Sequence, residues 1–188
     1  FVRWTKGMRL VSSNGFSSAE AAVLRNALSD YLLRGGYMAA LTLPAVDGMM
    51  LMQEYAYRTV AMDVIERYNL RTPQVAMSFL SRCLASSARE LSVNKVANEF
   101  KSRGVSTSRE TLANLLAYYE EAYLVFSLGD LSRALADNPR SSSKVYTVDP
   151  GMFAAFSRAA SKEEGQRLET AVFNKLRRIA PMARMGSL

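Results

Sequence analysis

The sequence predicts a mainly helical α+β protein organised around a winged helix-turn-helix between residues 92 and 149. Residues 92–103 and 109–121 carry apolar side chains at helical spacing, and a short turn led by Gly104 separates them. The apolar segment 122–128 and the alternating segment 144–148 then flank a polar loop, which is the pattern of a β-hairpin. Further helical patterns before residue 92 predict a helical connector that leads into this unit.

The composition is that of an ordinary globular protein. With 188 residues, of which 49% are hydrophobic, the chain is long enough for one or two small domains. Its 24 basic and 17 acidic residues give a net charge of +7, which suits an anionic partner and equally suits a solvated surface that aids solubility. Residues 150–188 carry 7 basic and 3 acidic groups, whereas residues 71–149 carry 10 and 8, so the helix-turn-helix itself is nearly neutral.

The cysteine and histidine content and the lengths of the apolar runs exclude several kinds of site. Cys83 is the only cysteine and there is no histidine, which excludes internal disulfides, cysteine-histidine zinc sites and catalysis by imidazole. We therefore expect a reducing, cytoplasmic location. No apolar run reaches the roughly 18–20 residues that span a membrane, so no membrane partner is expected. Because the chain begins at Phe1, we expect it to be a piece of a longer protein.

The first 72 residues predict two helices. Ser17 and Ser18 precede Glu20 as a helix N-cap, and Gly35-Gly36 ends that helix. A second helix over about 49–68 carries apolar residues around most of its surface, so we expect substantial burial. Its methionines fit core packing, and an adaptable binding surface is the alternative.

Residues 73 to about 88 predict the next helix. Pro73 suits its first position, since proline lacks the N–H that would be unpaired there. The expected inward face includes Cys83, which is predicted to be a buried, inert thiol.

The helix-turn-helix has clear end signals. Ser92 is expected to cap its first helix, Gly104 to end it, and Ser106 or Ser108 to cap the second. The expected buried stripe of the second helix is Leu112, Leu115, Leu116, Tyr119 and Tyr123.

A DNA-binding winged helix places its second helix in the major groove and its wing on the backbone. The second helix also carries Glu110, Glu120 and Glu121, whose charges repel phosphate. A packing or protein-interaction module is therefore the alternative to duplex DNA. The candidate nucleic-acid contacts are Lys95, Lys101 and Arg103 on the first helix, Ser106, Thr107, Ser108, Arg109 and Asn114 at the turn and second helix, and Arg133, Arg140 and Lys144 in the wing.

Five ordered stretches resemble a known family: YLLRGGY (31–37), VAMDVIERYNLRTP (60–73), TLANLLAYYEEAYLVFSL (111–128), SKVYTVDPGMFAAF (143–156) and GQRLETAVFNKLRR (165–178). This set, spanning residues 24–178, is similar to the C-terminal region of prokaryotic AAA-type ATPases, a domain of unknown function. The resemblance implies a connector over 1–72, a winged helix over 73–149 and the start of an endonuclease-like segment over 150–188. It also implies partners: the protein's own ATPase domain or a homo-oligomer.

The resemblance has departures that bear on activity. No Gly-x-x-x-x-Gly-Lys-Ser/Thr motif is present, so ATP and magnesium are expected only in a separate ATPase module and this chain has no cofactor of its own. The family's Gly-Gly-x-Pro reads Gly35-Gly36-Tyr37-Met38 here, which loses a rigid turn.

Glu169 matches the first-helix glutamate of a nuclease, but the further acidic strands that hold a metal are absent. We expect Glu169 to be structural, Asp149-Pro150-Gly151 to be a turn that closes the wing strand, and this chain not to be an enzyme. The basic cluster Lys175, Arg177, Arg178 and Arg184 fits either nucleic-acid contact or a solvated helix face.

Overall fold

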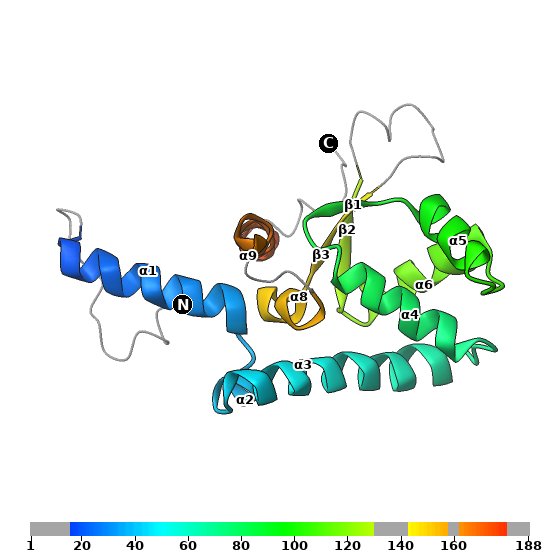
Figure 1. Ribbon diagram of the computed structural model, residues 1–188, viewed down its shortest axis with the longest axis horizontal. Helices are drawn as coiled ribbons and strands as arrows, with labels where there is room; N and C mark the ends of the chain where they lie inside the picture. The colour runs from blue at the N-terminus through cyan, green and yellow to red at the C-terminus, as the bar shows by residue number, and fades with distance from the viewer. Residues whose placement is uncertain (1–15, 130–142, 158–161, 180–188) are drawn as a thin grey trace.

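The computed structural model describes residues 16–129, 143–157 and 162–179, and it is mainly helical with one three-stranded antiparallel sheet (Figure 1). The α+β prediction is confirmed. In chain order the elements are α1 (Ser18–Arg34), α2 (Met38–Leu41), α3 (Ala45–Thr59), the π-helix η1 (Val60–Glu66), α4 (Pro73–Leu84), β1 (Arg89–Leu91), α5 (Val93–Ser102), α6 (Arg109–Glu121), β2 (Val125–Leu128), β3 (Ser143–Thr147), α8 (Pro150–Phe156) and α9 (Glu164–Ile179).

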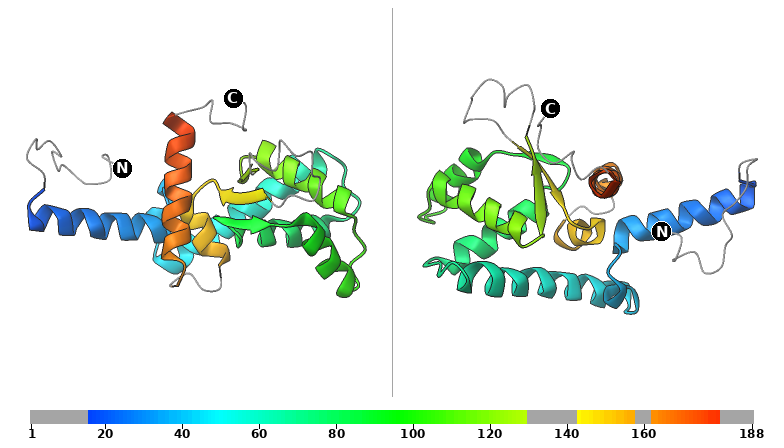
Figure 2. Two further views of the ribbon diagram at one scale, coloured as in Figure 1. Left: turned by 90° about the horizontal axis from the view of Figure 1, so that it is seen from above. Right: turned by 180° about the vertical axis from the view of Figure 1, so that it is seen from behind.

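Helix α1 projects from the body of the molecule, and α9 crosses the C-terminal part of α1 (Figure 2). As predicted, Ser17 caps α1: its hydroxyl accepts from the Glu20 N–H while the Glu20 carboxylate accepts from the Ser17 N–H. The helix ends at Gly35, whose φ of 75° lies in the left-handed region that glycine adopts at little cost. Both ends of α1 are therefore fixed by local sequence signals.

Helix α3 and η1 run beneath α4 and α8 (Figure 1). The predicted helix over 49–68 begins earlier, at Ala45, because Pro44 sets the extended backbone before the first turn. Its inward face is buried, with Met52 only 3% exposed and Ala56 fully covered. Met50 and Met62 are exposed, so the expectation of burial around most of the helix holds for one face only.

The predicted start of α4 at Pro73 is confirmed, but the helix ends at Leu84 and not near residue 88. Residues 85–88 turn instead into β1, a strand that the sequence pattern did not indicate. β1 pairs with β3, which also pairs with β2, giving the sheet order β1-β3-β2. The predicted hairpin strands are confirmed by the pairing of Phe126 with Tyr146.

The two faces of the sheet pack against different helices. Val125 and Val145 are fully buried in the main core, which also includes residues of α2, α3, η1, α4, β1, α5, α6 and α8. Phe126 and Tyr146 point the other way and meet Phe173 of α9, with the Tyr146 and Phe173 rings stacked 3.9 Å apart. Ala40 of α2 and Ala155 of α8 both belong to the main core. The predicted domain boundaries after residues 72 and 149 stay predictions.

Two further local predictions are wrong. Tyr123 is 58% exposed and has a φ of 55°, because α6 ends at Glu121 and the chain turns into β2. Asp149-Pro150 does not form an isolated turn but starts α8, in which the Asp149 carboxylate accepts from the Gly151 N–H at 2.8 Å.

Candidate nucleic-acid interface

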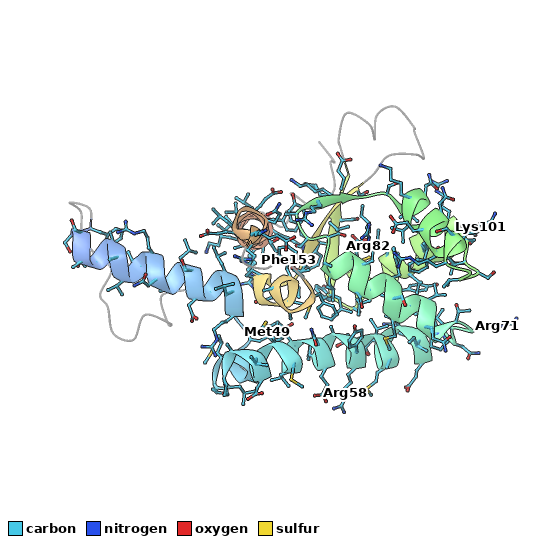
Figure 3. All side chains as sticks on the ribbon, viewed as in Figure 1. Met49, Arg58, Arg71, Arg82, Lys101 and Phe153 are labelled. Atoms are coloured by element: carbon cyan, nitrogen blue, oxygen red, sulfur yellow. The ribbon has the colours of Figure 1, made fainter. Side chains whose placement is uncertain are left out.

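The elements that carry most of the candidate contacts, α5, the turn and α6, lie together at the end of the molecule opposite α1 (Figure 1), where Figure 3 shows Lys101. Local sequence positions them. Gly104 has a φ of 75° and ends α5, and Ser108 then caps α6 by accepting from the Thr111 N–H at 3.0 Å. The exposed members of the set are Lys95, Lys101, Arg103, Ser106, Ser108, Arg109 and Asn114.

Thr107 differs from its neighbours in the turn. Its side-chain oxygen Oγ1 is buried and has no hydrogen-bond partner among the described residues. It is therefore turned away from the surface on which Ser106 and Ser108 lie.

One acid of this region is neutralised by a partner on another helix. Glu99 of α5 forms an ion pair with Arg82 of α4, at 3.4 Å between Oε1 and Nη2. Sequence reasoning missed Arg82, because the two residues lie on separate helices and no spacing rule connects them. With Glu99 paired, the exposed charges of α5 and the first turn of α6 are Lys95, Lys101, Arg103, Arg109 and Glu110.

The other two acids of α6 lie at its far end and are held in place by hydrogen bonds. Glu120 accepts from the Ser127 N–H, and Glu121 accepts from the Tyr68 hydroxyl at 2.5 Å. At 1.5 Å per residue, Glu120 lies about 16 Å along the helix from Arg109, beyond the screening length of about 8 Å at physiological salt. Repulsion of phosphate at the α6 N-terminus therefore comes mainly from Glu110.

Lys144 is placed differently from the other candidate contacts. It lies on the sheet face that α9 covers, and its Nζ pairs with Glu169 Oε1 at 2.5 Å. The Tyr146 hydroxyl also donates to Glu169 at 2.8 Å. Burial acts to raise the pKa of Glu169, but these two donors outweigh it and hold that pKa below its ordinary value. Glu169 thus holds α9 against the sheet.

The remaining basic residues of α9 and of the wing have varied placements. The Arg177 guanidinium lies over the Phe126 ring, with 3.4 Å from Cζ to the ring centroid. Arg133, Arg140 and Arg184 lie outside the described residues.

Comparison with known proteins identifies a family but no activity. Residues 25–163 match the family model described as a domain of unknown function, DUF8612. The chain belongs to the DUF8612 family. It is also 33% identical over 165 residues to the uncharacterized protein MJ1544 of Methanocaldococcus jannaschii, an alignment that covers 87% of this chain and 36% of the relative. The DUF8612 chain thus spans about a third of that relative's length, and no solved structure matches it.

The described part of this DUF8612 chain contains no group of three or more histidine, cysteine, aspartate or glutamate side chains placed to hold a metal ion. None of its described helices is long and apolar enough to cross a membrane. Cys83 is fully buried, as predicted, and burial raises the pKa of its thiol.

Proposed function

We propose that the region from α4 to β3 is a winged helix-turn-helix that binds duplex DNA through the N-terminal half of α6. The element order of helix, strand, two helices and two strands, with the sheet order β1-β3-β2, supports this proposal. The observation that carries it is the gathering of exposed cations on α5 and at the start of α6, beside a capped helix N-terminus. Both features suit a surface that meets phosphate.

In this proposal α6 enters the major groove. Arg109 and Asn114 reach base edges, because the N-terminal residues of a recognition helix lie deepest in the groove and both side chains have the donors that read purines. Lys95, Lys101 and Arg103 contact the phosphates that flank the groove and fix the orientation of the module.

Fluorescence anisotropy with a short labelled DNA duplex at low salt tests this function. The double variant Lys101→Gln/Arg109→Gln is expected to bind roughly tenfold or more weakly, as each lost contact costs about 1 kcal/mol or more. The control is Arg25→Gln/Arg58→Gln, which removes two exposed positive charges from α1 and α3. Absence of binding by the unmodified protein, or equal weakening by both variants, contradicts the proposal.

A second function is supported by a different surface. Met38, Val46, Met50 and Met62 on α2, α3 and η1 are 65%, 65%, 62% and 52% exposed. Exposed methionines adapt to varied partners, so we propose that this surface engages another protein or a second copy of the chain. Light scattering and co-purification with an AAA-type ATPase domain test this proposal. A strictly monomeric chain that does not bind that domain contradicts it.

We further propose that this chain is an accessory region of a longer protein, an AAA-type ATPase. The resemblance described above supports this, and the relative MJ1544 has room for such a module in the 64% of its length outside the alignment. A P-loop motif in the full gene product, with ATP hydrolysis that stops on replacement of its lysine, is the expected finding. A full-length sequence without that motif contradicts it.

A further inference from the structure

A cleft of about 910 Å³ lies between α1, α9 and the start of α8, away from the α5–α6 surface. Leu28 and Tyr31 of α1 form one wall and Leu168 and Val172 of α9 form the other. Figure 2 shows α9 crossing the C-terminal part of α1. The volume lies within the range of roughly 300–1,000 Å³ that is typical of small-molecule sites.

Hydrogen bonds fix the α1 wall of the cleft. The Asp149 carboxylate is 7% exposed and accepts from the Gly36 N–H and the Gly151 N–H, both at 2.8 Å. It therefore joins the end of α1 to the start of α8.

The α9 wall is fixed to the sheet by a buried polar network. The Asn174 side-chain amide donates to the Thr147 carbonyl at 2.9 Å, and the Thr170 hydroxyl lies 2.8 Å from the Ser87 hydroxyl. Because both walls are anchored, the cleft exists before any ligand arrives.

The charges that face the cleft are unequal. Lys175 and Arg178 line it from positions three residues apart on α9, which places both cations on one side of that helix. Asp149 is the acid among the lining residues, and its two oxygens are engaged by backbone N–H groups. Two positive charges against one negative charge leave a site that favours a single anionic group.

We propose that this cleft binds a small amphiphilic monoanion, whose acid group meets Lys175 and Arg178 and whose apolar body lies between Leu28 and Val172. The mainly apolar lining favours such a molecule over a nucleotide, because a polyphosphate needs a dense set of donors. The apolar lining also favours a small molecule over the DNA backbone, because bound DNA would place polar sugar and phosphate groups against apolar side chains.

The test uses the folded chain with two probes, the aromatic sulfonate 1-anilinonaphthalene-8-sulfonate and the medium-chain carboxylate dodecanoate. We expect saturable sulfonate fluorescence from one site and its displacement by dodecanoate. Dodecanol, which has the same apolar body without the charge, should displace it much less effectively. Equal displacement by dodecanol, or displacement by DNA duplex in place of dodecanoate, overturns the proposal.

Variants locate the site. Arg178→Gln and Val172→Asp should each lower the affinity for both probes at least fivefold. Arg58→Gln, which removes an exposed charge from α3, should leave that affinity unchanged. Near-UV circular dichroism checks that each variant keeps its fixed side-chain packing, since the sulfonate also binds loosely packed proteins that retain their secondary structure. As a measurement independent of the variants, dodecanoate should shift the backbone amide resonances of Tyr31 and Val172. Unchanged affinity in folded Arg178→Gln, or shifts confined to other residues, refutes the assignment.

Discussion

Replacement of Gly151 by alanine tests the junction between α1 and α8. Gly151 is the second residue of α8, and a Cβ atom there would lie 2.5 Å from the carbonyl carbon and oxygen of Arg34 and 2.6 Å from the Gly35 nitrogen. These are backbone atoms, so no side-chain rotation relieves the overlap. The two segments must separate, which disrupts the hydrogen bond from Gly36 to the buried Asp149 carboxylate.

The cost follows from that hydrogen bond. A hydrogen bond to a charged group contributes about 1.5–3 kcal/mol, and leaving the buried carboxylate short of a donor adds to the penalty. Alanine regains about 0.5–1 kcal/mol through its helix propensity. We therefore expect the free energy of unfolding to fall by about 3 kcal/mol and Tm by about 6–12 °C.

The matched control is Gly165→Ala. Gly165 is also the second residue of its helix, α9, but nothing lies within 4 Å of a Cβ placed there. This variant should be about 0.5 kcal/mol more stable than the unmodified protein. Urea unfolding followed by circular dichroism measures both variants. If Gly151→Ala is as stable as Gly165→Ala, the close approach of Arg34 and Gly151 does not hold α1 in place.

Three further predictions concern buried groups. Tyr119→Phe removes the hydroxyl that donates to the Ala76 carbonyl at 2.6 Å and should lower the free energy of unfolding by about 1 kcal/mol, with no change in urea unfolding contradicting this. Cys83 should react with a thiol reagent such as dithionitrobenzoate only after unfolding, since burial raises its pKa and excludes the reagent; rapid labelling of the folded protein would show otherwise. Burial also raises the pKa of Asp149, so the folded state binds its proton more tightly than the unfolded state does. The free energy of unfolding of the unmodified protein, relative to that of Asp149→Asn, should therefore fall as the pH rises above about 4. If urea unfolding gives the same pH dependence for both proteins, the prediction is wrong.

Much of the fold could be predicted because its helices carry local end signals. The helix starts depend on backbone groups within a few residues of the capping or first residue, so they can be predicted from the sequence. These residues are Ser17, Pro73, Ser92 and Ser108. The start of α8 was missed because aspartate followed by proline is typical of both a turn and a helix start, and only the buried environment of Asp149 decides between them.

Features that depend on tertiary contact could not be predicted. Strand β1 has three residues and exists as a strand only through its pairing with β3. The cleft is assembled from Tyr31, Asp149 and Arg178, which are far apart along the chain.

The same limit applies to the nucleic-acid surface. The exposure of Lys101 and Arg109 followed from helical periodicity. The partners of Glu120, Glu121 and Lys144 depend on how β2, the turn after η1 and α9 pack, which periodicity does not specify.

The salt dependence of duplex binding tests the central claim most directly. Each phosphate contact adds about 0.9 to the magnitude of the slope of log K against log salt, so the phosphate contacts of Lys95, Lys101 and Arg103 predict a slope of about −3. The variant Lys101→Gln/Arg109→Gln should reduce the magnitude of that slope by about 1, because Lys101 contacts a phosphate and Arg109 a base edge. A slope near zero for the unmodified protein, or the same slope in this variant, would contradict DNA binding by the α5–α6 surface.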